Sequence, residues 1–239
     1  MDTIKFDKGS TRVIAHRGIP SLERENTCAS YIAAGNRSHF AIECDVRLTA
    51  DGVFVISHDN NLARVTGEEI TVEDNTLETL QSVLWYDIEG GKSRADLRLC
   101  TLDNYLDICR QYDKFCVVEL KAYFTTEQLC ALVDKIASRY DLDRAMFISF
   151  HYDDLVKLRG ILPNAKIQWL FKEYTDETMD KLKAARFDAA ISSKILTEEL
   201  LEQFHENGME VNVWVINDRQ TAERFVAAGV DYITTNTLE

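Results

Sequence analysis

Residues 40–46, FAIECDV, have the composition of a short buried β-strand, and runs of this kind recur along the 239-residue chain. Amphipathic stretches such as TLDNYLDICRQY (101–112) separate them, and several begin on Ser, Thr, Asn or Asp as helices do. Eight strands alternating with helices imply parallel βαβ units, because parallel strands need a crossover connection. The sequence therefore predicts an α/β fold, a (β/α)8 TIM barrel, with a doubly wound open sheet as the alternative. Strands are expected over 12–15, 40–46, 115–120, 145–149, 166–171, 187–191, 210–215 and 230–234.

One segment interrupts this alternation. The strand at 40–46 is followed by a turn, a second apolar run, VFVIS (53–57), and then a long stretch before the next helix. Loops of such length are usually functional or carry small elements of their own. We expect a small insertion after the second strand, at about 60–100, with one helix near 76–85 and no second core. The absence of a linker or low-complexity tract predicts a single domain over 1–239.

Composition excludes several classes of protein. The net charge of −13 argues against a nucleic-acid partner or an anionic membrane surface. No run of 18 apolar residues is present and the N-terminus lacks a signal-like apolar run, so we expect no membrane span and a cytoplasmic location. The six cysteines form no CxxC pair and no zinc spacing, which favours buried free thiols in a reducing compartment.

Three carboxylates lie in two of the predicted strands. Side chains alternate along a strand, so Glu43 and Asp45 share a face of one strand, and Glu119 lies on the other. In a barrel the carboxyl ends of the strands form the rim of the active site. Three carboxylates there repel one another unless a cation lies among them, and oxygen ligands suit Mg²⁺ or Ca²⁺. The alternative is that each carboxylate pairs separately with an arginine or a lysine.

Basic and imidazole side chains also follow the apolar runs. His16 ends VIAH and His58 ends VFVISH, and two imidazoles that titrate near neutrality can serve as acid and base on one substrate. Arg17 offers a planar fork for paired phosphate oxygens, and Lys121 offers a point charge. A single histidine at a strand end is more often structural, but the coincidence of all these groups at strand ends favours a phosphate-handling site.

These motifs resemble the glycerophosphodiester phosphodiesterase family. The similarity covers Val13 to about Thr235 and rests on five segments: HRGIPSLERENT (16–27), IECDVRLTADGVFVISHDNNLARVTG (42–67), VVELK (117–121), VNVWVIN (211–217) and GVDYITT (229–235). Members are (β/α)8 barrels with a small insertion after the second strand. This chain departs from the family in reading Thr235-Asn236-Thr237 where a TDxP-like turn is common, and we expect its last barrel helix to be nearly absent.

The resemblance implies an enzyme that hydrolyses glycerophosphodiesters, which are small molecules, to sn-glycerol 3-phosphate and an alcohol. It implies one divalent cation, Mg²⁺ or Ca²⁺. Either water or the neighbouring glycerol hydroxyl could attack the phosphorus. The alternatives are a phosphodiester lyase that releases a cyclic phosphate from a phospholipid, and a non-catalytic barrel that binds a phosphorylated ligand. By resemblance the roles are an acid/base pair of His16 and His58, a metal site of Glu43, Asp45 and Glu119, phosphate contacts from Arg17 and Lys121, and a pocket wall at Trp214.

Two further residues precede the first predicted helix. Asn26 is expected to be its N-cap, and Glu25 either braces Arg17 or faces solvent.

Overall fold

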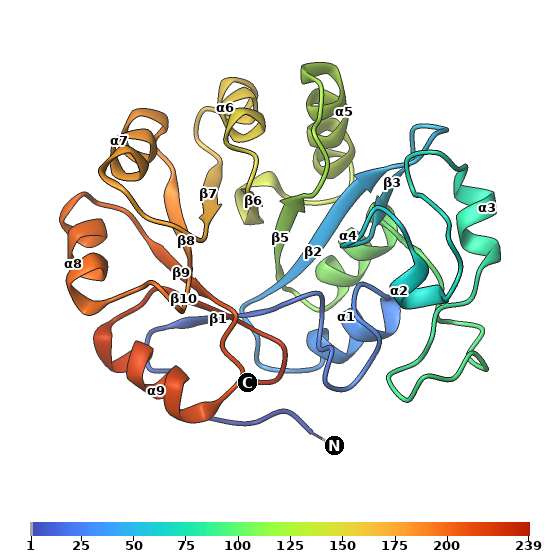
Figure 1. Cartoon of the computed structure of the whole chain (residues 1–239), viewed down its shortest axis with the longest axis horizontal. Helices are drawn as coiled ribbons and strands as arrows, with labels where there is room; N and C mark the ends of the chain where they lie inside the picture. The colour runs from blue at the N-terminus through green and yellow to red at the C-terminus, as the bar shows by residue number, and fades with distance from the viewer. Residues whose placement is uncertain (1) are drawn as a thin grey trace.

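Eight parallel strands close into a ring in the computed structural model, which describes residues 2–239 (Figure 1). The ring is complete because β1 pairs with both β2 and β10, so the predicted (β/α)8 barrel is confirmed and the open sheet is excluded. Most of the expected strand bounds are matched within one or two residues. The barrel strands are β1 (Arg12–Ala15), β2 (Ala41–Leu48), β5 (Phe115–Leu120), β6 (Ala145–Ser149), β7 (Lys166–Phe171), β8 (Asp188–Ser192), β9 (Val211–Trp214) and β10 (Tyr232–Thr235).

Helices surround the ring on its outside (Figure 1). Threonine side chains cap several of them, for example Thr101 and Thr125, each of which forms a reciprocal capping box. Gly229 ends α9 in the left-handed conformation. The outer helices are α1 (Cys28–Gly35), α4 (Leu102–Gln111), α5 (Thr126–Ala137), α6 (Tyr152–Ile161), α7 (Asp176–Ala185), α8 (Glu198–Glu206) and α9 (Arg219–Ala228), with a 3-10 turn at Leu142–Arg144.

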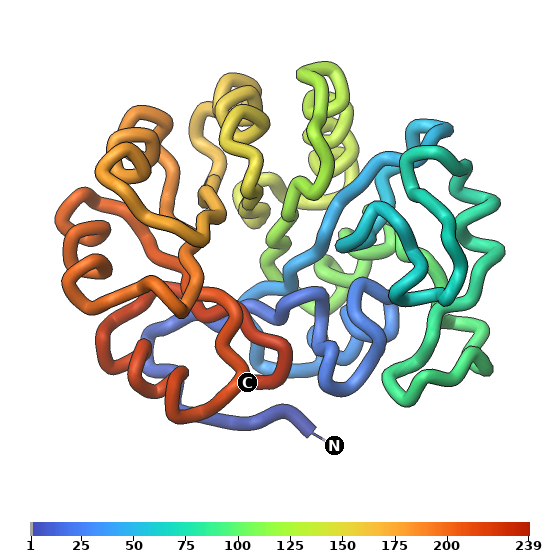
Figure 2. The backbone as a smooth tube through the Cα atoms, in the orientation of Figure 1, coloured from blue at the N-terminus to red at the C-terminus, as the bar shows by residue number. Residues whose placement is uncertain are grey.

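No helix follows β10 within residues 2–239, as expected. The ends of the described chain lie beside each other instead (Figure 2), where Ile4 and Leu238 form a parallel bridge. The backbone N–H of Ile4 donates to the carbonyl of Thr237 at 2.9 Å. Among residues 2–239, none of the helices is long and apolar enough to cross a membrane.

The insertion after β2 is more elaborate than predicted. It contains β3 (Phe54–Ile56), which pairs antiparallel with β2, then α2 (Ala63–Thr66), α3 (Leu77–Ser82) and β4 (Cys100–Thr101). It also has an apolar cluster of its own around Trp85, which is 1% exposed, so the expectation of one helix and no second core was wrong. A four-residue helix is too short to show a helical period in the sequence, which explains why α2 was missed.

Side chains along β2 separate two environments. Ile42, Cys44 and Val46 pack in the large core between sheet and helices. Ala41 belongs to a smaller cluster inside the ring. By alternation Glu43 and Asp45, which lie between the outward residues, point with Ala41 into the barrel.

Candidate active site

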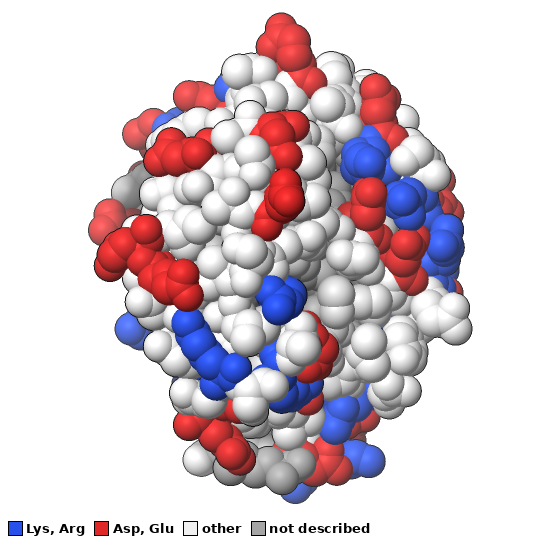
Figure 3. Space-filling view, turned by 90° about the vertical axis from the view of Figure 1, so that its right-hand side faces the viewer, with Lys and Arg blue, Asp and Glu red and all other residues white. Residues whose placement is uncertain are grey.

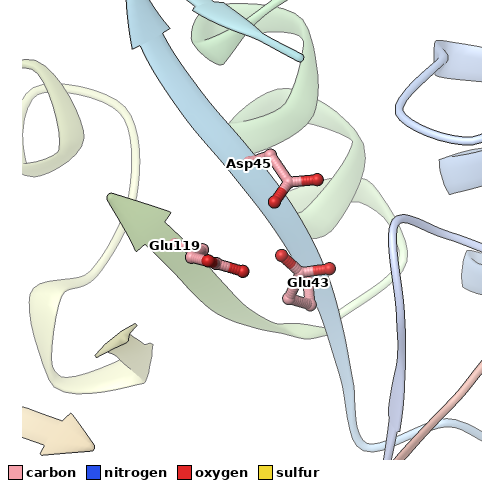
Figure 4. Close-up of side chains that lie close together, drawn as sticks. All are labelled: Glu43, Asp45 and Glu119. Carbon is pink, nitrogen blue, oxygen red and sulfur yellow. The ribbon is translucent and has the colours of Figure 1, made fainter. Parts of the chain in front are cut away.

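The three predicted carboxylates converge at the carboxyl ends of β2 and β5. The strands pair in register so that Asp45 lies opposite Glu119, and Glu43 lies one inward position earlier on β2. Figure 4 shows the three side chains turned toward a common space between the two strands. One oxygen from each lies within 4.8 Å of the others, and all three residues are at most 6% exposed. The strand-alternation argument for this cluster is therefore confirmed.

Burial and mutual repulsion perturb these groups in different directions. Burial, together with the charge of Asp45, raises the pKa of Glu119 to about 7. The same causes raise the pKa of Glu43 well above its usual range. Burial acts on Asp45 as well, but Arg17 and Lys121 hold the pKa of Asp45 below its ordinary value. The raised pKa values of Glu43 and Glu119 indicate that the site does not hold three negative charges together readily unless a cation lies among them.

Basic side chains pair with only part of this cluster. Arg17 Nε lies 3.2 Å from Asp45, and Lys121 Nζ lies 2.9 Å from Glu119 and 3.6 Å from Asp45. Glu43 accepts a bond of 2.8 Å from the backbone N–H of Arg17 and forms no ion pair among the described residues. Separate pairing, the alternative considered above, thus accounts for two of the carboxylates and not for Glu43.

Unpartnered oxygens show what this cluster can hold. Glu43 Oε1 and Asp45 Oδ1 are buried and have no hydrogen-bond partner within residues 2–239. An unpaired buried carboxylate oxygen costs free energy unless a ligand satisfies it. An all-oxygen donor set suits a hard divalent ion such as Mg²⁺ or Ca²⁺. The residues present fit such an ion.

Both predicted histidines line the pocket that contains Glu43 and Glu119. His16 Nδ1 lies 2.8 Å from Asn236 Oδ1, and His58 Nδ1 lies 2.7 Å from Asp59 Oδ1. These partners are acceptors, so we assign a proton to each Nδ1, which leaves Nε2 of each neutral ring able to accept one. Burial, aided by Arg17, lowers the pKa of His16 to about 4. Burial also lowers the pKa of His58, although Asp45 opposes this shift.

The backbone around His16 and Arg17 needs a special sequence. Arg17 adopts a φ of 57°, and Gly18 follows with a φ of 82°. A Cβ on Gly18 would lie 2.2 Å from the hydroxyl oxygen of Ser30, so only glycine fits there. This turn directs the N–H of Arg17 toward Glu43.

Asn26 is a site residue and not the predicted helix cap. The side chain of Thr27 accepts the capping bond of α1 instead. Asn26 has a φ of 56°, which asparagine tolerates better than most residues, and its Nδ2 donates to Asp45 Oδ2 at 2.7 Å. It is 0% exposed, and its Oδ1 accepts from the hydroxyl of Tyr31. Asn26 and Thr27 are adjacent and are both residue types that cap helices, so the sequence before α1 could not distinguish them.

An arginine of the insertion connects the partner of His58 with the partner of Arg17. Arg64 on α2 donates to Asp59 at 2.6 Å and contacts Glu25 through both terminal nitrogens, at 3.0 and 2.8 Å. Glu25 in turn accepts from Arg17 at 3.0 Å, so Glu25 braces Arg17. Ion pairs of this kind attach the insertion to the barrel, and acidic and basic side chains are interspersed on that side of the molecule (Figure 3). Sequence reasoning missed Asp59 and Arg64; the HD pair at 58–59 was the available signal.

Aromatic and apolar side chains form the remaining wall. Trp214, at the end of β9, lines the pocket and packs edge-on against Phe150, with 5.6 Å between ring centroids. Its indole N–H is buried and has no hydrogen-bond partner among the described residues. Lys172 also lines this side and lies 5.2 Å from the Phe150 ring. All predicted site residues thus line one pocket except Asp45, which contacts two of the lining residues, Arg17 and Lys121.

Residues 16–239 match the glycerophosphoryl diester phosphodiesterase family. The chain belongs to this family. It is therefore an enzyme, a phosphoric diester hydrolase, as the motifs predicted. A glycerophosphodiester phosphodiesterase of Caldanaerobacter subterraneus subsp. tengcongensis is 30% identical over 236 residues, which cover 96% of this chain and 95% of the relative.

Solved structures show the same barrel as this phosphodiesterase. An Oleispira antarctica phosphodiesterase in complex with the product sn-glycerol-3-phosphate has a TM-score of 0.88 at 25% identity, covering 94% of this chain and 92% of that one. A glycerophosphodiester phosphodiesterase of Parabacteroides distasonis has a TM-score of 0.79 at 26% identity, covering 96% and 94%.

Proposed function

We propose that this phosphodiesterase hydrolyses glycerophosphodiesters to sn-glycerol 3-phosphate and an alcohol at a divalent-metal site, with His16 and His58 as its acid/base pair. The observation that carries this proposal is a single pocket lined by two imidazoles, a carboxylate cluster, Arg17 and Lys121. The product bound in the Oleispira antarctica relative supports the choice of substrate.

Glu43, Asp45 and Glu119 would hold the ion, Mg²⁺ or Ca²⁺, and two of the available oxygens, Glu43 Oε1 and Asp45 Oδ1, lack partners within residues 2–239. When bound, the ion supplies positive charge that stabilises the charge developing on the phosphoryl oxygens. Arg17 is held by Glu25 and Asp45, so its guanidinium is oriented before the substrate arrives. Preorganised charge of this kind favours the transition state because no reorganisation is needed during reaction.

The partners of the two imidazoles differ in charge, and this difference separates their roles. Asp59 is a carboxylate and stabilises an imidazolium, so His58 is the acid that protonates the departing alkoxide. Asn236 offers a neutral amide oxygen, so His16 stays neutral and accepts the proton of the attacking oxygen at Nε2. Such acid and base groups typically contribute about 10²–10⁴-fold each to the rate.

Lys121 and Trp214 would position the substrate. The ammonium of Lys121 bridges Asp45 and Glu119 and lines the pocket, where it can also contact a phosphate oxygen. Trp214 presents a flat apolar wall and an unpaired indole N–H beside the same space. A hydroxyl or phosphate oxygen of the substrate would satisfy that donor.

Product analysis with and without chelator tests the proposal. The enzyme is incubated with glycerophosphocholine or glycerophosphoethanolamine in EDTA and then with Mg²⁺ or Ca²⁺ restored, and phosphorus NMR follows the products. We expect metal-dependent formation of sn-glycerol 3-phosphate. A matched control, Glu202→Gln, changes an exposed glutamate on α8 and should leave the rate unchanged. Turnover of these diesters that is indifferent to EDTA would contradict the metal site, and a persistent cyclic phosphate would favour the lyase.

A further inference from the structure

Two cysteines distant in sequence touch one another outside the active-site pocket. Cys28 is the first residue of α1, and Cys100 begins β4, where the insertion returns to the barrel. Their sulfur atoms are 3.4 Å apart although the residues are separated by 72 positions. A disulfide requires about 2.05 Å, so the two sulfurs need to approach by roughly 1.4 Å in all.

We propose that Cys28 and Cys100 form a dithiol/disulfide pair that hydrogen peroxide closes into an intramolecular disulfide between α1 and β4. The proposal does not depend on the function proposed above, because neither thiol lines the pocket.

The two thiols differ in a way that divides the chemistry between them. Cys28 is partly exposed, so an oxidant in solution reaches it, whereas Cys100 is 1% exposed. The hydrogen bond between the two sulfurs lowers the pKa of the Cys28 thiol. That bond and burial raise the pKa of Cys100. A thiolate is the reactive form, so Cys28 is the sulfur that is oxidised first.

The reaction balances in two steps. The Cys28 thiolate attacks one oxygen of hydrogen peroxide, which breaks the O–O bond, forms a sulfenic acid and releases hydroxide. The sulfur of Cys100 then attacks the sulfenic sulfur, forming the S–S bond and expelling the second hydroxide. Each hydroxide takes up one of the two thiol protons to form water, and the two electrons lost by the thiols reduce the peroxide. A small dithiol such as dithiothreitol reverses the reaction.

The remaining cysteines are poor competitors. Cys44, Cys109 and Cys116 are 0% exposed, so dissolved peroxide does not reach them in the folded enzyme. Cys130 is exposed on α5, and its thiol forms no hydrogen bond with another sulfur among residues 2–239. It can be oxidised, but it lacks the sulfur–sulfur contact that Cys28 makes within the described residues.

The new bond would connect the barrel to the end of the insertion. Asn26, whose side chain donates to Asp45, lies two residues before Cys28. The cross-link therefore also restrains the start of α1, next to Asn26. A bond that closes a long loop restricts the unfolded chain more than the folded one. We therefore expect oxidation to raise Tm by about 5–10 °C.

Peptide mapping of the full-length enzyme tests the pair directly. Reduced protein is treated with hydrogen peroxide, blocked with N-ethylmaleimide and digested with trypsin and Asp-N. This digestion leaves Cys28 in 25–37 and Cys100 in 99–102, and it separates Cys100 from Cys109. We expect one linked species, 25–37 joined to 99–102, a loss of two hydrogen atoms from the intact mass, and full reversal by dithiothreitol.

Two variants complete the test. Cys28→Ser should abolish both the link and the rise in Tm, and the control Cys130→Ser should keep them. Circular dichroism is used to check that each variant folds. If Cys28→Ser does not fold, Cys28→Ala takes its place. Links through Cys109 or Cys116, stable over-oxidation of Cys28 without a link, or an unchanged or lowered Tm in linked protein would each overturn the proposal.

Discussion

Replacing Glu43 by glutamine should stabilise the metal-free enzyme and lower its affinity for a divalent metal ion. Three buried carboxylates meet two basic side chains, Arg17 and Lys121, and within residues 2–239 Glu43 is the carboxylate of this cluster without an ion pair. Glutamine keeps an oxygen that can accept from the Arg17 N–H, as Glu43 Oε2 does at 2.8 Å. The substitution therefore removes an acid whose ionisation the cluster disfavours and keeps its hydrogen bond.

The magnitude follows from the distances. At 4.8 Å and an effective dielectric of about 20, each like-charge pair costs about 3 kcal/mol. Glu43 takes part in two such pairs, with Asp45 and with Glu119. Lost attraction to Arg17, and proton uptake by the unsubstituted cluster, offset most of this repulsion. We expect a net gain of about 2 kcal/mol in the free energy of unfolding without metal, or about 4–8 °C in Tm.

With metal bound, the parent should become more stable than Glu43→Gln. A bound ion stabilises the folded parent by mass action, and a neutral amide is a weaker ligand than a carboxylate. The dissociation constant for Mg²⁺ or Ca²⁺ should rise by about ten-fold or more in Glu43→Gln. Urea unfolding in EDTA and in saturating metal measures the stabilities, isothermal calorimetry measures the affinity, and Glu202→Gln serves as the control. A variant less stable than the parent in EDTA would refute the reasoning, because Glu43 would then belong to a structural network.

Three further predictions concern other groups. His58→Ala should lower kcat by about 10²–10⁴-fold with substrate affinity nearly unchanged; calorimetry that shows lost binding would make it a binding residue. Arg64→Met, which frees Asp59 and Glu25, should lower kcat about ten-fold with KM within about two-fold, since residues that orient a catalytic group typically matter by 10–100-fold. Lysine keeps the charge of Arg64 but not its planar fork, so Arg64→Lys should lose nearly as much, and an unchanged kcat in Arg64→Met would speak against geometric support. Burial raises the pKa of Asp188 from 3.8 to about 6, so the folded protein binds a proton that the unfolded chain releases between these values. Stability should therefore fall by about 2 kcal/mol as pH rises from 4 to 6, and Asp188→Asn should flatten this dependence in urea titrations; an unchanged slope in the variant would refute it.

The barrel was predictable because its strands are buried on both faces. The expected bounds at 12–15, 115–120, 145–149 and 166–171 coincide with β1, β5, β6 and β7. Continuous apolar runs of this length are distinctive in a sequence. The chain does not need a helix after β10 to close the ring, since closure comes from hydrogen bonds between β1 and its two neighbours.

The carboxylate cluster was predictable for a related reason, while its supporting residues were not. Alternation fixes the common face of Glu43 and Asp45 without knowledge of the fold. Asn26 reaches Asp45 because its backbone adopts a left-handed conformation, which side-chain periodicity does not encode. The cysteine pair was missed for a different reason: contact between positions 72 residues apart depends on how the insertion folds.

The insertion explains why one half of the proposed acid/base pair lies away from the barrel strands. His58 follows β3, the second strand of a hairpin, and not a strand of the ring. Arg47 of β2, 9% exposed, donates to the carbonyls of Ser57 and His58 at 3.1 and 2.8 Å and so anchors that chain end from the barrel side. Arg64 anchors it from the insertion side through Asp59. The chain end that carries His58 thereby gains two independent restraints, which the proposed acid needs if its proton is to meet one defined oxygen. Changes in the length or packing of the insertion should consequently affect the acid more than the carboxylates, which the barrel alone positions.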